Sequence, residues 1–152
     1  MDMGGWLAEE FEVPEQLETP SYRLRKLTLE DAVKDYDAVM TSVDRLQTVF
    51  GVDSGWPSPD MSLHYDMVDL GWHQKEFELR RSFAYTMVTL DERVCVGCAY
   101  IFPAPREGAD AKAYCWVRTS HAHLDDDLFR TFKQWIAEVW PFESVIYPGR
   151  GD

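Results

Sequence analysis

The side chains best suited to bind or transform a charged ligand are concentrated between Arg118 and Asp127. Within that stretch two histidines, His121 and His123, follow the arginine, and three consecutive aspartates begin at Asp125. The flanking patterns predict a strand before it and a helix after it. The stretch should therefore end at a helix N-terminus, where free backbone N–H groups bind anions. The position predicts an anion site, whereas the aspartates would repel an anion placed there.

Three elements must position this corner. Residues 112–117 form a predominantly apolar run that predicts a strand. Apolar residues recur three and four positions apart over 124–140, which predicts an amphipathic helix that ends at Pro141. Residues 144–147 predict a short strand that returns parallel to the first. The buried face of the helix is expected to consist of Leu128, Phe132, Trp135, Ile136 and Val139.

The remaining sequence supplies more strands and two more helices. Thr28 and Ser62 are placed to cap the helices, and the acidic turn at 91–92 predicts an antiparallel hairpin. The expected buried stripes are Ala32, Val33, Tyr36, Val39, Met40 and Val43 in one helix and Leu63, Met67, Leu70 and Phe77 in the other. The expected elements are a strand over 22–27, helices over 28–46 and 63–80, strands over 83–90, 94–102 and 112–117, the helix over 124–140 and the strand over 144–147. This order predicts an α/β (α+β) fold with a mixed, mostly antiparallel sheet.

Length and composition fit one globular domain. The chain has 152 residues, of which 45% are hydrophobic, enough for a sizeable core. Residues 1–20 are expected to form an acidic N-terminal arm that packs on the surface, and residues 21–152 to form the domain. No apolar run reaches the roughly 20 residues of a membrane span, and no secretory signal is evident, so we expect a cytoplasmic protein without a membrane partner. The net charge of −12 disfavours nucleic acid as a partner.

The three cysteines are expected to be free thiols, since their number is odd and no secretory signal precedes them. Cys95 and Cys98 match a metal or redox half-motif. They lie in a predicted strand, however, where residues three apart face opposite sides. We therefore expect buried core thiols and no metal site. His121 and His123 also lack the further ligands that a metal would need.

Ten short motifs, spread over most of the chain, occur in a specific order and spacing. They are Tyr22–Arg25, Asp35–Met40, Trp56-Pro57, Asp69–His73, Glu76-Phe77, Phe83–Thr86, Gly97–Ile101, Tyr114–Arg118, Trp140–Phe142 and Tyr147–Arg150. Together they resemble the GNAT superfamily of N-acetyltransferases, and more closely a bacterial GNAT-like subgroup with an atypical phosphate loop. The resemblance implies a twisted mixed sheet with flanking helices, in which the strands before and after the last helix splay apart.

The resemblance also implies acetyl-CoA as co-substrate, bound in that splay. Its pantetheine arm would pair with the backbone of residues 115–118, and its pyrophosphate would meet N–H groups of residues 120–124. A backbone N–H near Val117 or Arg118 would stabilise the oxyanion. The cofactor-binding residues implied in this way are Trp116, Val117, Arg118, Thr119, Ser120, His121, Ala122, His123 and Leu124.

Two departures from the GNAT pattern concern the phosphate loop. His121 and His123 occupy the two positions at which the superfamily has glycine or a similarly small residue, which lets phosphate approach the backbone. Three aspartates then follow in the first turn of the helix. These departures predict weak, altered or absent cofactor binding, offset in part by Arg118 and by partial protonation of the histidines.

Acetyl transfer to an amine also needs a base for the ammonium group and an acid for the leaving thiolate. His73 and Glu76 are the leading candidates for the base, with Glu78 and His121 as alternatives. Tyr147 is the candidate acid, because of its place in the last strand. Each has a structural interpretation as well: His73 and Glu76 as a solvated pair on a helix, and Tyr147 as a core residue.

The sequence thus predicts an N-acetyltransferase that moves an acetyl group from acetyl-CoA to an amine of a small molecule or peptide. GNAT enzymes usually continue with a further helix and strand that often carry a catalytic tyrosine, and we expect that source of acid to be missing. Two alternatives stay open. One is a catalytically degenerate GNAT-like binding module. The other is an interaction protein whose last strand is covered by a second subunit, as in a homodimer.

Overall fold

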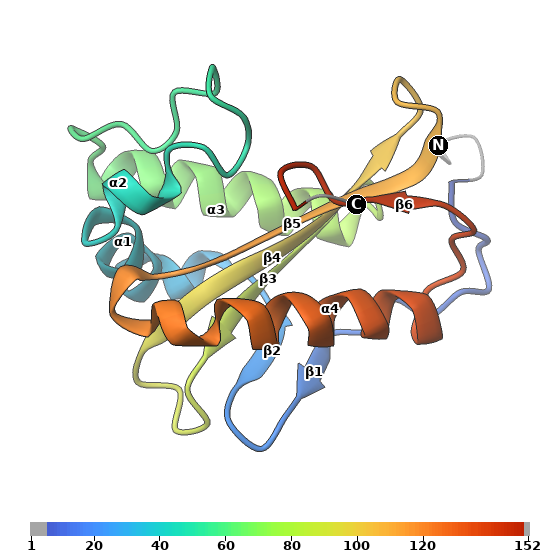
Figure 1. Cartoon of the computed structure of the whole chain (residues 1–152), viewed down its shortest axis with the longest axis horizontal. Helices are drawn as coiled ribbons and strands as arrows, with labels where there is room; N and C mark the ends of the chain where they lie inside the picture. Colours follow the sequence, from blue (N-terminus) through green and yellow to red (C-terminus); the bar gives the residue numbers. More distant parts are fainter. Residues whose placement is uncertain (1–5, 151–152) are drawn as a thin grey trace.

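A six-stranded sheet with helices on both faces forms the fold (Figure 1). The computed structural model describes residues 6–150. The strands lie in the order β1-β2-β3-β4-β5-β6, and every neighbouring pair is antiparallel except β5 and β6, which are parallel. The elements are β1 (Gln16–Glu18), β2 (Arg23–Lys26), α1 (Ala32–Met40), α2 (Val43–Leu46), α3 (Leu63–Glu78), β3 (Phe83–Val88), β4 (Cys95–Ala104), β5 (Ala109–Val117), α4 (Asp125–Val139) and β6 (Val145–Ile146), with 3₁₀ helices at Leu29–Asp31 and Thr119–Leu124. The predicted mixed, mostly antiparallel sheet is confirmed.

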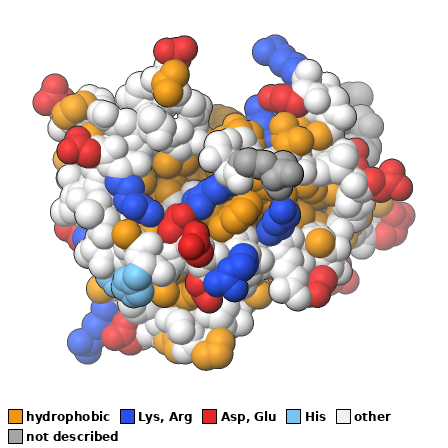
Figure 2. Space-filling view, in the orientation of Figure 1, with side chains coloured by type: hydrophobic (Ala, Val, Ile, Leu, Met, Phe, Trp, Pro, Cys, Tyr) orange, Lys and Arg blue, Asp and Glu red, His pale blue; other side chains and the backbone are white. Residues whose placement is uncertain are grey.

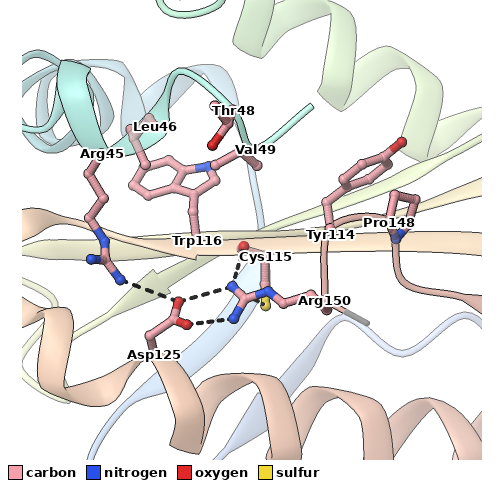
Figure 3. Close-up of a pocket in the computed structure, with 11 residues that line it drawn as sticks. Arg45, Leu46, Thr48, Val49, Tyr114, Cys115, Trp116, Asp125, Pro148 and Arg150 are labelled. Atoms are coloured by element: carbon pink, nitrogen blue, oxygen red, sulfur yellow. Dashed lines mark hydrogen bonds and ion pairs between the residues drawn. The ribbon is translucent and has the colours of Figure 1, made fainter. Parts of the chain in front are cut away.

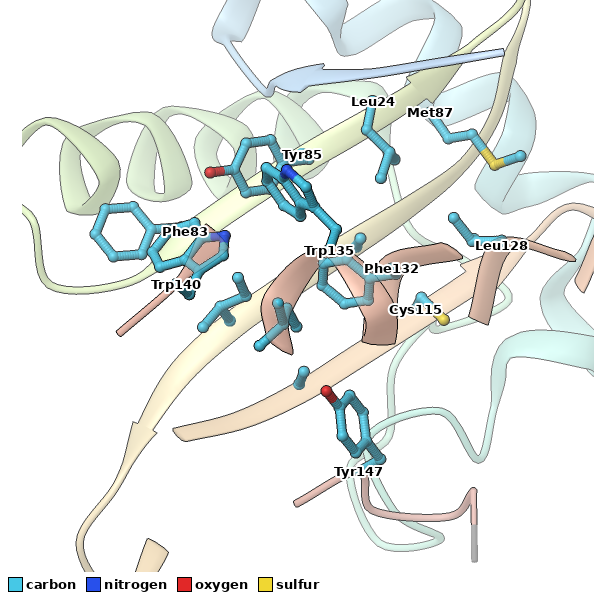
Figure 4. Close-up of a cluster of buried hydrophobic side chains, with 14 of the residues drawn as sticks. Leu24, Phe83, Tyr85, Met87, Cys115, Leu128, Phe132, Trp135, Trp140 and Tyr147 are labelled. Carbon is cyan, nitrogen blue, oxygen red and sulfur yellow. The ribbon is translucent and has the colours of Figure 1, made fainter. Parts of the chain in front are cut away.

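Each face of the sheet packs on its own hydrophobic cluster. On one face α4 packs against β2, β3, β4 and β5, and Figure 4 shows Phe132 and Trp135 among the rings buried there. Trp135 meets Tyr85 of β3 edge to face at 5.4 Å, a favoured aromatic geometry. Residues of α1 and α3 cover the opposite face. Strand β4 contributes to both clusters, which confirms the expected central strand covered on both sides.

A β-bulge in β4 changes which side chains share a face. Met87 pairs with Gly97 and Val88 pairs with Cys95, so Val96 is an extra residue on this strand. Cys95 and Cys98 therefore both enter the cluster beneath α1 and α3. The prediction that they face opposite sides is wrong, because the bulge inserts one residue between them. Both thiols are free and buried, as expected. Among the described residues, no group of three His, Cys, Asp or Glu side chains could hold a metal.

The helix predicted over 28–46 is divided into a 3₁₀ turn, α1 and α2. Thr41 ends α1, and its hydroxyl donates to the carbonyl of Asp37, a local bond that competes with helix continuation. Ser42 then accepts a hydrogen bond from the backbone N–H of Thr119, far along the chain. The break ties α2 to the end of β5, and it turns the following residues toward that strand. Val33, expected in the buried stripe, is 69% exposed instead.

The buried face of α3 differs from its apolar stripe. Leu63 and Met67 are partly exposed, whereas Asp66 of the same helix is buried beside Leu70. The expected stripe is wrong in its first half, because the carboxyl of Asp66 faces that of Asp35 on α1 inside the fold. Val139, expected on the buried face of α4, is the last residue of that helix and is exposed.

Part of the predicted N-terminal arm joins the sheet. Gln16–Glu18 pair with β2 as an additional edge strand, β1. Ahead of it, the Arg80 side chain donates to the carbonyls of Ala8 and Phe11. The indole of Trp6 donates to the carbonyl of Asp110, so the arm crosses the sheet edge near β5. No helix in residues 6–150 is long and apolar enough to cross a membrane.

Candidate functional site

The parallel pairing of β5 and β6 ends after two residue pairs, Ala111 with Val145 and Lys112 with Ile146. If the same register continued, the carbonyl of Ala113 would accept from the backbone N–H of residue 148. That residue is Pro148, which has no N–H to donate. The two strands therefore separate after Lys112 and Ile146. The edge of β5 from Ala113 to Val117 is left without a strand partner.

A cavity of about 220 Å³ lies at this open edge (Figure 3). Its walls come from α2 and the residues after it, from β5, from the first residue of α4 and from the turn after β6. The lining residues are Arg45, Leu46, Thr48, Val49, Tyr114, Cys115, Trp116, Asp125, Pro148, Gly149 and Arg150. In the space-filling view of the same face, acidic and basic side chains lie side by side at the hollow (Figure 2).

Two arginines from opposite walls of the cavity converge on one carboxylate. Arg150 contacts Asp125 with both terminal nitrogens, with an Nη2–Oδ1 distance of 3.0 Å, and Arg45 approaches the same carboxylate at 3.6 Å. Each arginine also reaches the open strand. Arg150 donates to the carbonyl of Cys115 at 2.9 Å, and Arg45 donates to that of Val117 at 3.0 Å. The guanidinium groups thus occupy backbone acceptors that β6 would have satisfied.

The backbone groups of β5 alternate between β4 and the cavity. The N–H of Arg118 donates to the carbonyl of Val96 on β4 at 2.8 Å. Residues Cys115 and Val117 therefore direct both their backbone groups toward the open edge. Of the two oxyanion donors predicted from sequence, the N–H of Arg118 is committed to the sheet and the prediction is wrong there. The N–H of Val117 faces the cavity side.

The side chain of Arg118 lies on the other face of the sheet. Its guanidinium is buried, and it donates to the carbonyl of Cys95, to the Asp37 carboxylate and to the Thr41 hydroxyl. These partners belong to β4, to α1 and to the residue that directly follows α1. Arg118 anchors the break between α1 and α2, and it does not line the cavity.

The predicted phosphate loop, Thr119–Leu124, consists of 3₁₀ turns with a kink at His121, whose backbone is not helical. Part of its backbone is used internally: the N–H of His121 donates to the carbonyl of Arg118. Burial, together with the neighbouring charges of Arg118 and His123, lowers the pKa of His121. Protonation of this histidine is therefore less available to offset negative charge than the sequence suggested. Neither histidine lines the cavity.

Of the other residues predicted to bind cofactor, Trp116 lines the cavity, and its buried indole donates to the Tyr100 hydroxyl at 2.9 Å. Ser120, Ala122 and His123 are exposed. Thr119 is also exposed, Leu124 is half-buried, and the Val117 side chain is buried toward α4. Of the predicted set, Trp116 alone lines this cavity; Val117 and Arg118 are buried on opposite faces of the sheet, and the others lie in the partly exposed segment after β5.

None of the predicted catalytic side chains lines the cavity. Tyr147 is buried under α4, where it meets the ring of Phe129 at 5.4 Å, and burial raises its pKa to about 12. Glu76 is paired with Lys75 and Arg81. These contacts give Tyr147 a place in the core and Glu76 a place in an ion-pair network on the outer end of α3.

His73, the other leading candidate for the base, is also largely enclosed, with 12% of its side chain exposed. Its Nε2 lies 3.8 Å from the Asp69 carboxylate, and its ring packs on Tyr100. Burial lowers the pKa of His73, with partial opposition from Asp69. We expect its NMR titration midpoint to fall below 6.5, which makes it neutral at pH 7. His64, exposed on the same helix, is the internal reference, and a His73 midpoint above 6.5 would contradict the prediction.

Sequence reasoning did not single out Arg45 or Asp125 as a pair, and it used Arg150 only as part of a motif. The Pro148-Gly149 turn directly after a short strand was the available signal, since it predicts that pairing stops and that the next side chain turns back. Nothing local marks Arg45, because its direction depends on the break between α1 and α2.

Comparison with solved structures shows the class of fold. RimL, a ribosomal L7/L12 alpha-N-protein acetyltransferase solved with coenzyme A, superposes with a TM-score of 0.62 at 13% identity, covering 80% of this chain and 67% of RimL. A ribosomal-protein-S5-alanine acetyltransferase from Vibrio fischeri gives 0.60 at 14% identity, covering 82% and 67%. The microcin C7 self-immunity acetyltransferase MccE, solved with acetyl-CoA and AMP, gives 0.59 at 9% identity, covering 84% and 70%.

No protein-family model and no curated sequence matches the chain. The structural likeness therefore carries the comparison, and it shows the fold. The chain has the fold of the GNAT acetyltransferases, as the resemblance in sequence implied. Its splayed strands are β5 and β6, and the cavity lies in the splay.

Proposed function

We propose that the protein is an acetyl-CoA-dependent N-acetyltransferase. The observation that carries this proposal is the open edge of β5 beside a cavity, at the splay of a GNAT fold. A strand edge without a strand partner is suited to bind the amides of a pantetheine arm by strand-like pairing. Two structural neighbours with this fold, RimL and MccE, were solved with coenzyme A or acetyl-CoA.

In this proposal the backbone of Cys115 and Val117 pairs with pantetheine, and the thioester lies deeper in the splay, on the side of Ala113. A backbone N–H of β5 at that point of the open edge donates to the oxyanion that forms when the amine attacks the thioester carbon. The amine loses a proton as the C–N bond forms, and the tetrahedral intermediate then expels the CoA thiolate. No acidic or histidine side chain except Asp125 lines the cavity among the described residues. We infer that solvent or the acceptor itself handles these protons.

The acceptor in this proposal is an amine of a peptide or small molecule. Two structural neighbours are named as acetyltransferases of ribosomal proteins, which favours a peptide α-amine as the first acceptor to test. The protein's acidic balance, with a net charge of −12, is compatible with a cationic acceptor.

Binding and turnover test the proposal separately. Calorimetric titration and thermal shift with acetyl-CoA should show saturable binding, and release of CoA thiol should depend on an added amine. The panel should include short peptides with free and with blocked N-termini, so that the blocked peptides serve as matched controls. An absence of binding at millimolar acetyl-CoA would refute the proposal.

A second candidate is a GNAT-like binding module without catalysis. It is favoured by the position of the predicted bases, since neither His73 nor Glu76 lines the cavity. The two proposals differ in one result. The binding module would bind acetyl-CoA or another ligand without releasing thiol in the presence of any amine in the panel.

A further inference from the structure

The cavity contains a charge arrangement that resembles an occupied anion site. The carboxylate of Asp125 is held by Arg45 and Arg150, and a carboxylate is the side-chain group closest to phosphate in its pairing with guanidinium. Arg45 and Arg150 are also the two cationic side chains among the described residues that line the cavity. The Asp125 carboxylate therefore occupies the position in which an anionic ligand could contact both Arg45 and Arg150.

The groups predicted from the sequence to bind the diphosphate, namely the loop backbone, Arg118 and His121, are poorly placed to do so. The stretch predicted to cradle it has no glycine and forms 3₁₀ turns. Arg118 is bound on the other face of the sheet, and protonation of His121 is disfavoured. A diphosphate at this corner would need other cations.

We propose that Arg45 and Arg150 are the diphosphate-binding groups of this protein, and that Asp125 holds them in the free state as an internal competitor. The inference rests on the proposed function, because acetyl-CoA supplies the diphosphate. On binding, the two guanidinium groups exchange Asp125 and the carbonyls of Cys115 and Val117 for phosphate oxygens. The same movement frees those carbonyls for the pantetheine amides. The cofactor thus displaces the hydrogen bonds between the arginines and the strand. Its phosphates bind the released guanidinium groups, and its pantetheine amides bind the released carbonyls.

The placement of the two arginines supports this exchange. Arg45 is about one-third exposed at its side chain and Arg150 about one-quarter, so each has solvent beside it into which it can turn. They come from the segments after α1 and after β6, on opposite sides of Asp125. A ligand entering between them would contact both.

Calorimetry with three probes tests the proposal: coenzyme A, pantetheine and inorganic pyrophosphate. Arg45→Gln and Arg150→Gln should each weaken CoA binding about tenfold and leave pantetheine within about twofold, since charge-assisted bonds to phosphate are lost. Asp125→Asn should tighten CoA binding about tenfold by removing the competitor. Asp126→Asn removes the same charge from the same turn at an exposed position, and Arg130→Gln removes a positive charge from the exposed side of α4. Both controls should stay within about threefold, because they act only through screened charge.

The outcomes separate this inference from the proposed function. Equal effects of Asp125→Asn and Asp126→Asn, or losses of pantetheine and CoA affinity that are the same in the arginine variants, would overturn it. If CoA does not bind at all, the pyrophosphate arm decides. Binding of pyrophosphate to Asp125→Asn that is abolished by a second change, Arg45→Gln, would keep the anion site while the acetyltransferase proposal fails. Absence of that binding would overturn both. Arg150→Lys provides a folded alternative if Arg150→Gln is unstable.

Discussion

Replacing Gly97 with alanine is expected to lower the free energy of unfolding by about 3 kcal/mol or more. Gly97 lies in the bulge of β4, where this strand passes close to β5. A Cβ at this position would lie 2.1 Å from the carbonyl oxygen of Trp116 and 3.1 Å from the Cα of Val117. All of these are backbone atoms, so no side-chain rotation can relieve the contact. The strands would have to separate next to the cavity.

Chemical denaturation followed by circular dichroism measures this effect. Gly71→Ala is the matched control, because an added Cβ there meets no atom within 4 Å inside a continuous helix. That control should stabilise the protein by up to about 1 kcal/mol, the helix propensity difference between glycine and alanine. Similar free energies of unfolding for the two variants would show that the bulge accommodates a side chain. Since β5 carries the open edge, Gly97→Ala should also weaken any ligand bound there.

Raising the pH from 4 to 7 is expected to lower the free energy of unfolding through a pair of buried carboxyl groups. Asp35 on α1 and Asp66 on α3 are both buried and interact with each other, and the Cys98 thiol donates to Asp35. Burial raises the pKa of Asp35 well above its ordinary value and that of Asp66 to about 6. The folded protein therefore holds protons that the unfolded chain releases near pH 4.

The sign follows from the raised pKa values. The stability contribution of the pair is fully present below about pH 4 and is lost as the pH rises through the raised pKa values, that of Asp66 being about 6. For Asp66 the loss amounts to up to about 3 kcal/mol, at 1.36 kcal/mol per pKa unit. Asp66→Asn should reduce this dependence, with the part due to Asp35 remaining, and make the variant more stable than the natural chain at pH 8. Asp53→Asn, at an exposed position, controls for the general effect of net charge. A natural-chain stability that rises between pH 4.5 and 7 would contradict the prediction.

Most of the sheet could be predicted because its signals are local. The hairpin of β3 and β4 follows from two apolar runs around an acidic turn, and α4 follows from a regular apolar spacing. The bulge at Val96 could not be predicted, since one extra residue leaves no mark in a strand that is apolar on both faces. The buried position of Asp66 likewise could not be predicted from local sequence, since it depends on packing against a distant residue, Asp35, whose carboxyl it faces.

The strand–loop–helix corner at the end of β5 was predicted from the sequence and is present in the fold. Most of the residues that line the cavity beside it were not predicted as site residues. Sequence reasoning assigned the role of phosphate partner to Arg118, although that side chain is held by Cys95, Asp37 and Thr41 and does not line the cavity. The arginines that line the cavity come from segments whose course is set by tertiary contacts, such as the bond from Thr119 to Ser42.

Because Pro148 has no N–H, the separation of β5 and β6 is favoured by the amino-acid sequence itself. If a residue with an N–H occupied this position, β6 could extend its parallel pairing along β5, and the gap between the strands would close. In such a closed sheet, each ligand would have to break hydrogen bonds between β5 and β6, and this would lower its affinity. With proline in this position one backbone hydrogen bond of that continuation cannot form, and the side chains of Arg45 and Arg150 bond to the open edge instead. A ligand could therefore enter and leave this gap by displacing the side chains of Arg45 and Arg150, without breaking hydrogen bonds between strands of the sheet.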